Sequence, residues 1–194
     1  MIFQTRFIAF IFLFAIAPLG CHISNKAATL NKGDDMLVRK LDSILLTVDD
    51  LPTMAVDPTM NHRIGGVGKH PRVVDGFEQS WDGTQPEEHI YVKYWLFSSV
   101  ADAQTAADVW RNFIASAAIE VNGRIESAYQ PEPYAAEVIG DATWRTANGA
   151  SIWFVKNNVL IYVMRRRPEV YQLKFTRMVA RKIEAKINAA LPKK

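Results

Sequence analysis

The glycine-rich stretch RIGGVGKHP at residues 63–71 is the first candidate for chemistry, because it carries the glycines and the lysine of a phosphate-binding loop. Such a loop reads G-x-x-x-x-G-K-[ST] and leads into a helix whose amides surround the phosphates. Arg63 stands where the first glycine is required, and His70 replaces the hydroxyl residue that holds magnesium. Pro71 also pushes His70 toward extended geometry. The sequence therefore excludes this class of nucleotide hydrolase.

Carboxylates and histidines form a second candidate set, for hydrolysis. A glycosidase needs two carboxylates about 5–9 Å apart in a cleft, and general-base chemistry needs an imidazole within reach of its proton. Neither G-x-S-x-G nor H-E-x-x-H occurs in the chain. A hydrolase with a carboxylate/His pair is kept as the alternative function, and no catalytic residue is predicted. The candidate acids are Asp75, Glu78, Asp82, Glu87, Glu88 and Asp141, with His70 or His89 as the base.

Residues 52–70 are rich in Gly, Pro and Asn and are predicted to form a long loop, of a length that is often functional. The loop carries His62 and His70, with Asp57 and Asp75 nearby. A metal site needs three or four convergent ligands, and this spacing matches no ligand pattern. We therefore predict no metal and no cofactor.

Aromatic residues in the second half of the chain are the candidates for binding. Asn148-Gly149 and Asn157-Asn158 are two-residue hairpin signals. The first register places Trp144 opposite Trp153, and the second places Trp153 opposite Tyr162. This row of three rings is a candidate platform for a glycan, lipid or peptide. An open groove lined by the rings, or by Trp81 and Trp95, would favour binding. Buried rings would favour a structural or assembly role.

The elements that must position these residues follow from hydrophobic periodicity. Helical spacing predicts helices over 34–46, from Ser98 or Ser99 to about 119, and from Pro168 onward. Branched and aromatic residues predict strands over 72–81 and 88–97, followed by a meander over 137–166. This order predicts an α+β fold, with an antiparallel meander sheet and helices packed mainly on one face.

The first twenty-one residues, MIFQTRFIAFIFLFAIAPLGC, predict export. The apolar run from Phe7 to Ala17 suits a secretory signal and is too short to span a bilayer. Cys21 follows a small residue, as in the lipidation motif of bacterial lipoproteins, although Pro18 replaces the usual aliphatic residue. The alternatives are cleavage after Ala17 and a buried N-terminal helix. We predict a lipoprotein signal peptide at 1–20, lipidation of Cys21, a tether at 21–33 and a single domain at 34–192.

Charge and cysteine content restrict the partners. From Lys156 to Lys194, eleven Lys and Arg face only two Glu, within a net charge of +3 for the 194 residues. Arg165, Arg166 and Arg167 with the last helix form a candidate basic patch for anionic lipid or an acidic partner. The alternative is a solvated helix face. Nucleic acid is not expected, because the chain is predicted to be exported. A single cysteine allows no internal disulfide.

Four segments in order, LLTVDDLP, FSSVADAQTAADVW, IGDATW and NNV, resemble a group of small bacterial extracytoplasmic lipoproteins of unknown function. They are also loosely similar to the sensor domains of actinobacterial serine/threonine kinases, which carry disulfides that this chain lacks. The resemblance covers roughly residues 36–190. It implies an envelope location facing the periplasm, and His22 after Cys21 implies the outer membrane. The expected function is a lipid-anchored, non-enzymatic binding or interaction module, with an envelope protein or a small ligand as partner.

Overall fold

The computed structural model describes residues 36–65, 73–84, 89–116, 118–121, 124–127, 129–131, 138–146, 151–165 and 173–192. Backbone contacts divide the chain after Leu30, and all described elements belong to the unit Asn31–Lys194. The predicted signal peptide, Cys21 and the tether lie outside the described residues. Within the described ranges, no helix is both long enough and apolar enough to cross a bilayer.

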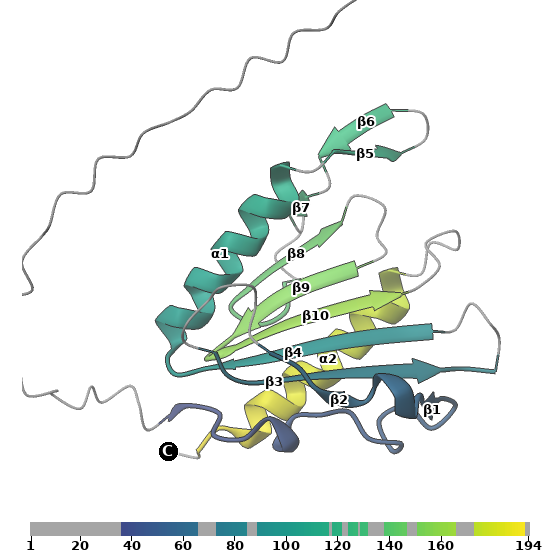
Figure 1. Cartoon of the computed structure of the whole chain (residues 1–194), viewed down its shortest axis with the longest axis vertical. Helices are drawn as coiled ribbons and strands as arrows, with labels where there is room; N and C mark the ends of the chain where they lie inside the picture. Colours follow the sequence, from purple (N-terminus) through teal and green to yellow (C-terminus); the bar gives the residue numbers. More distant parts are fainter. Residues whose placement is uncertain are drawn as a thin grey trace, which may run out of the picture. The chain divides into compact units, whose positions relative to one another are not determined.

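An antiparallel sheet of eight strands forms the centre of the domain (Figure 1). The strand order is β1-β3-β4-β10-β9-β8-β7, and β2 also pairs with β3. Strands β5 (Ala118–Val121) and β6 (Arg124–Ser127) form a separate two-stranded hairpin. The strands of the main sheet are β1 (Ala55–Val56), β2 (His62–Arg63), β3 (Val73–Asp82), β4 (His89–Phe97), β7 (Tyr129–Pro131), β8 (Ala142–Thr146), β9 (Ser151–Lys156) and β10 (Val159–Arg165).

The two hairpin registers predicted from the turn signals are confirmed. Trp144 pairs with Trp153 between β8 and β9, and Trp153 pairs with Tyr162 between β9 and β10. Asn157 adopts a φ of 56° in the second turn, a conformation that asparagine tolerates better than most residues. The Asn157-Asn158 turn therefore agrees with the observed β9–β10 register, while Asn148-Gly149 lies outside the described residues.

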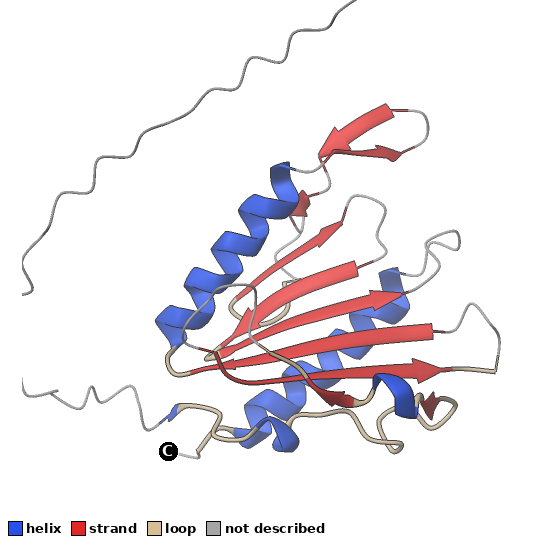
Figure 2. Cartoon of the chain, in the orientation of Figure 1, coloured by secondary structure: helices blue, strands red, loops and turns tan. Residues whose placement is uncertain are grey.

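Two long helices, α1 (Val100–Ser116) and α2 (Leu173–Ala190), pack against this sheet. Ser99 caps α1, since its Oγ accepts a hydrogen bond from Asp102 N at 3.1 Å. The predicted α+β class with an antiparallel sheet and packed helices is confirmed. The helices lie on opposite faces, however, and do not share one (Figure 2). The reason is that β4, β9 and β10 are apolar on both faces, so both faces need cover.

Residues 37–46 form an extended strap across the α2 face and not the predicted helix. Their only regular turn is the 3-10 helix η2 (Leu41–Ser43). Two buried carboxamide side chains take the place of helical hydrogen bonds. Asn158 accepts from Val38 N at 2.9 Å and donates to Val38 O at 3.0 Å, and Gln79 bonds Leu46 N and O at 3.0 and 3.1 Å. The buried residues of the strap are Leu37, Val38, Leu41, Ile44 and Leu46.

The described part of the predicted long loop, 52–65, is ordered along the outer edge of β3. Strands β1 and β2 pair with β3, and the 3-10 helix η3 (Pro58–Met60) lies between them. Ile64 N donates to Gly76 O at 2.9 Å. A Cβ on Gly76 would stand 2.7 Å from Ile64 O, so only glycine permits this approach. The segment therefore closes an edge that would otherwise expose unpaired backbone groups.

Candidate functional site

One row of directly paired residues crosses the face of the sheet that α1 covers, here called the α1 face. It runs from the β2 edge to β8 and changes from polar to aromatic at β10. Because paired residues on neighbouring strands point to the same side, the row forms one continuous surface. Its members are His62, Glu78, Lys93, Tyr162, Trp153 and Trp144.

The aromatic half of the row centres on Trp153. Its ring centroid lies 6.2 Å from Trp144, 6.0 Å from Trp95, 5.1 Å from Trp110 of α1 and 4.2 Å from Tyr162. Trp144 and Trp153 are only 3% and 5% exposed, while Tyr162 is half-buried. Burial raises the pKa of the Tyr162 hydroxyl. The predicted row exists, but the faces of its two tryptophans are occupied by packing, so the row is not an open platform and these buried rings favour a structural role.

The indole N–H groups of this cluster have unusual surroundings. Within the described part of the chain, those of Trp95, Trp110 and Trp144 are buried without a hydrogen-bond partner. An unsatisfied buried donor costs about 1–3 kcal/mol. These tryptophans therefore contribute here through the packing of their rings and not through their N–H groups.

A small hollow of about 180 Å³ lies between α1 and the start of β8, where Trp144 reaches it from the row. Two ion pairs border it. Arg111 Nη2 lies 2.8 Å from Asp108 Oδ1, and Lys156 Nζ lies 2.9 Å from Asp141 Oδ1. The lining therefore offers acceptors and donors with almost no net charge. The lining residues are Gln104, Ala107, Asp108, Arg111, Asp141, Ala142, Trp144 and Val155.

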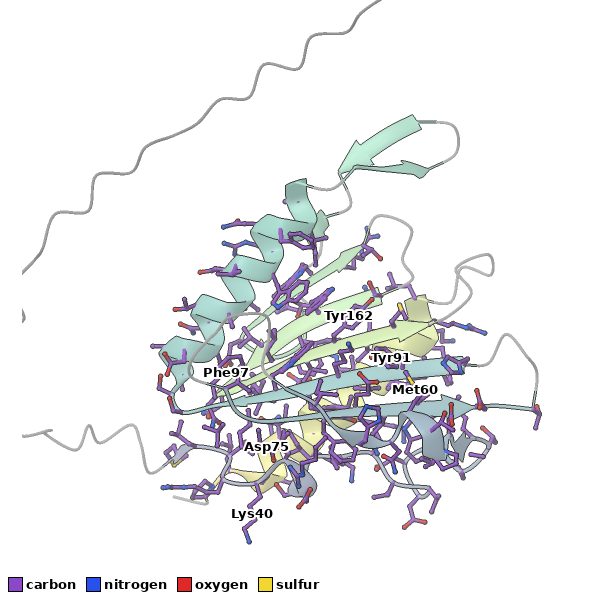
Figure 3. All side chains as sticks on the ribbon, viewed as in Figure 1. Lys40, Met60, Asp75, Tyr91, Phe97 and Tyr162 are labelled. Atoms are coloured by element: carbon purple, nitrogen blue, oxygen red, sulfur yellow. The ribbon has the colours of Figure 1, made fainter. Side chains whose placement is uncertain are left out.

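The polar half of the row is a buried carboxylate with three partners. Glu78 is 6% exposed, and Tyr91 Oη donates a hydrogen bond to its Oε2. Lys93 Nζ lies 3.4 Å from the same oxygen, and His62 Nε2 lies 3.7 Å from Oε1. Burial raises the pKa of Tyr91, and the charge of Glu78 raises it further. Tyr91 and Tyr162 mark this region in Figure 3. The carboxylate is paired, and the cluster ties β2, β3 and β4 together.

A hydroxyl, an imidazole and a carboxylate meet at the end of the β3–β4 hairpin on this same face. Ser80 Oγ lies 3.1 Å from His89 Nε2, and His89 Nδ1 lies 2.5 Å from Asp82 Oδ1. The two contacts use opposite nitrogens of one ring. This connectivity is that of a nucleophile, a base and an orienting acid.

The structure separates the other acids and bases named from the sequence. Asp75 pairs with Arg63, and Asp57 caps η3 through Thr59 N at 2.9 Å. Among the described residues, no three His, Cys, Asp or Glu side chains are placed to hold a metal ion. His70, Glu87 and Glu88 lie outside the described residues.

Of the three arginines in the predicted basic patch, Arg165 lies among the described residues, as does the last helix, α2. Arg165 is 5% exposed, and its guanidinium lies 5.8 Å from the ring centroid of Phe175 of α2. Arg166 and Arg167 lie outside the described residues. Arg165 is therefore a packing residue at the end of β10.

Ser80 and Gln79 were missed in the sequence, and Asn158 was named there only as a turn residue. Ser80 and Asp82 alternate on a strand, with His89 across a short loop, so the two-residue period of β3 was the signal that could have grouped them. Gln79 and Asn158 are buried amides, and no local pattern marks what they bind.

No protein-family model and no curated protein matches this chain. Among solved structures, the extracellular domain of PknH from Mycobacterium tuberculosis is similar, with a TM-score of 0.48 and 14% identity, over 80% of this chain and 99% of that one. This is a distant likeness.

Proposed function

We propose that this chain is a lipid-anchored binding module of the bacterial envelope that takes a small, hydroxyl-rich ligand in the hollow between α1 and β8. The proposal of a lipid anchor rests on the sequence, which predicts a signal peptide at 1–20 and lipidation of Cys21. The anchored domain would lie at the outer membrane and face the periplasm. The observation that carries the binding role is the hollow itself, where the predicted aromatic row meets a polar lining at Trp144.

The charges of the hollow support an uncharged ligand. Asp108 is matched by Arg111, and Asp141 by Lys156, so a strongly charged ligand would have to break an existing pair. Hydroxyl groups both donate and accept hydrogen bonds, and they suit a lining of carboxylates, guanidinium and amide. The volume is below the roughly 300–1,000 Å³ of pockets for drug-sized ligands. A single sugar ring has the size and polarity that fit.

Trp144 is the member of the aromatic row that lines this site, and the rest of the row supports it. Trp144 lines the hollow and stacks on Trp153, with 4° between their planes. Trp153 in turn contacts Tyr162, so all three residues of the predicted platform contribute, the latter two as support. A ligand that touches Trp144 therefore changes the surroundings of a stacked fluorophore.

A fluorescence titration of the full chain tests the binding role. N-acetylglucosamine is the neutral probe, and N-acetylmuramic acid is the charged comparison. We expect saturable quenching by the neutral sugar and weaker binding of the acid. Arg111→Ala should weaken binding about tenfold or more, since a hydrogen bond to a charged group contributes about 1.5–3 kcal/mol.

Val109→Ala is the matched control, because Val109 lies on the same helix and is 59% exposed. It should bind like the parent chain. Equal affinity of Arg111→Ala and Val109→Ala, or no saturable quenching by either sugar, would remove the hollow as the binding site.

Intact mass of the membrane-extracted protein tests the anchor separately. We expect a mature chain that begins at Cys21 and carries acyl mass, and a Cys21→Ala variant that lacks this mass. A chain cleaved after Ala17 without lipid would contradict the lipoprotein prediction.

A further inference from the structure

The Ser80, His89 and Asp82 array is independent of the binding role. Its two contacts, 3.1 Å from Ser80 Oγ to His89 Nε2 and 2.5 Å from His89 Nδ1 to Asp82 Oδ1, join three groups in one line. In that order the imidazole can take the hydroxyl proton while the carboxylate holds the ring and stabilises its charge. We propose that these residues form an acyl-transfer site for esters with a short acyl group.

Backbone pairing fixes the array. Asp82 pairs with His89, and Ser80 pairs with Tyr91, so all three functional side chains stand on the same face of two neighbouring strands. The outer side of β3 is also held, since Asp57 N donates to Ser80 O at 2.9 Å. A site on paired strands keeps its geometry better than one on a loop.

Burial determines which substrates fit. Ser80 is fully buried, whereas the His89 and Asp82 side chains are 12% and 57% exposed. The array therefore leads from solvent at Asp82 to an interior hydroxyl at Ser80. Because Ser80 is fully buried, the proposal is restricted to a short acyl group such as acetyl.

The reaction balances with an ester and water alone. Ser80 Oγ attacks the acyl carbon as its proton passes to His89 Nε2, and the ester C–O bond breaks as that proton passes to the leaving alcohol. Water then gives a proton to His89 and its hydroxide attacks the acyl-serine. The acyl group leaves as the carboxylic acid, and the proton returns to Ser80.

The proposal of acyl transfer at this site and the proposal of sugar binding in the hollow can be tested independently. The array lies on β3 and β4, and the hollow is lined by α1, β8 and Val155 of β9, so that β10 lies between the strands of the two sites. Substitutions in the array leave Trp144, Asp108 and Arg111 untouched. Loss of acyl transfer with intact sugar binding would thus concern the array alone.

The test uses 4-nitrophenyl acetate with the full chain. Samples quenched early should show the mass of one acetyl group, and peptide mapping should place that group on Ser80. The Ser80→Ala variant should form no acetyl-enzyme at this position. It should also lose the part of 4-nitrophenyl acetate hydrolysis that proceeds through Ser80. Ser151→Ala is the matched control, since Ser151 is 2% exposed on the same face and bonds Thr146 instead of a histidine. It should be acetylated like the parent chain.

Two further variants test the relay. His89→Gln and Asp82→Asn should slow acetylation by about 10²-fold or more, the usual contribution of a positioned base, and His62→Gln should not. Circular dichroism of each variant verifies that it is folded. Acetylation away from Ser80, no acetyl-enzyme in the folded parent chain, or equal rates in folded His89→Gln and His62→Gln would overturn the proposal.

Discussion

The two faces of the sheet are built from the same strands and have different chemistry. The α2 face is apolar and closed: α2 and the strap leave Ile90, Val92, Phe154 and Ile161 with no exposed area. The α1 face carries stacked tryptophans, the Glu78 cluster and the Ser80 array, and its buried carboxylate Glu78 has Tyr91 and Lys93 as partners. The period of two along a strand thus gives the two faces of the same strands different side chains.

The largest expected effect comes from opening the α2 face. Phe154→Ala should lower the free energy of unfolding by about 3–5 kcal/mol, because a fully buried ring is lost and a cavity remains. Tyr162→Phe, on the α1 face, should change it by less than about 1.5 kcal/mol, since it removes one hydroxyl that bonds Ser151. Urea unfolding of both variants measures the contrast. Similar losses would show that the two faces do not divide their roles in this way.

The next effect comes from releasing the strap. Asn158→Ala removes the partner of Val38 N, Val38 O and Phe97 O. Leaving buried backbone groups unsatisfied should lower stability by about 3 kcal/mol. Hydrogen exchange of the Val38 amide should accelerate together with this loss.

Asn157→Gly is the control for that variant. Its φ of 56° suits glycine, and it leaves the strap contacts in place. It should cost little in stability and leave exchange at Val38 slow. Fast exchange at Val38 in the control would show that the turn, and not the carboxamide, holds the strap.

The smallest effect concerns the ion pair between Lys186 of α2 and Asp50, which follows the strap in the chain. Partial burial alone would raise the pKa of Asp50, but hydrogen bonds from Lys186 and Thr47 outweigh it and hold the pKa below its usual value. A lowered pKa contributes stability above the unfolded-state value near 4, and that stability is lost as the pH falls through the folded-state pKa. Asp50→Asn should therefore cost about 1 kcal/mol at pH 7 and progressively less below about pH 4.

Asp49→Asn changes an exposed neighbour and should have almost no effect at either pH. Thermal unfolding across a pH series compares the two variants. A cost for Asp50→Asn that did not decrease in acid would assign the effect to packing and not to the charge.

The sheet could be predicted because its signals are local. The turn signals Asn157-Asn158 and Asn148-Gly149 predict which residues pair, and the aromatic row follows by counting along the strands from each turn. The strap was mistaken for a helix because Leu37, Leu41 and Ile44 have helical spacing. Its backbone is bound instead by Gln79 and Asn158, which lie 33 and 120 residues away from their partners. Competition from such distant side chains leaves no trace in a short window of sequence.

The candidate site, too, was predictable where its signals are local and unpredictable where it depends on distant contacts. The row of Trp144, Trp153 and Tyr162 was predicted. Its burial under α1 was not, because that depends on which face of the sheet α1 packs against. His89 and Asp82 were among the predicted acids and bases, yet Ser80 joined them only through the β3–β4 register. Residue types can thus indicate candidate catalytic groups, and the pairing of strands determines which of these groups lie within contact distance of one another.

The strap also bears on how the domain would respond to tension. Among the hydrogen bonds of the strap described above, those that join Val38 to Asn158 come first in the chain, and those that join Leu46 to Gln79 come second. Gln79 lies on β3 and Asn158 lies in the turn between β9 and β10, so a pull on the strap would load the sheet directly at two separate points.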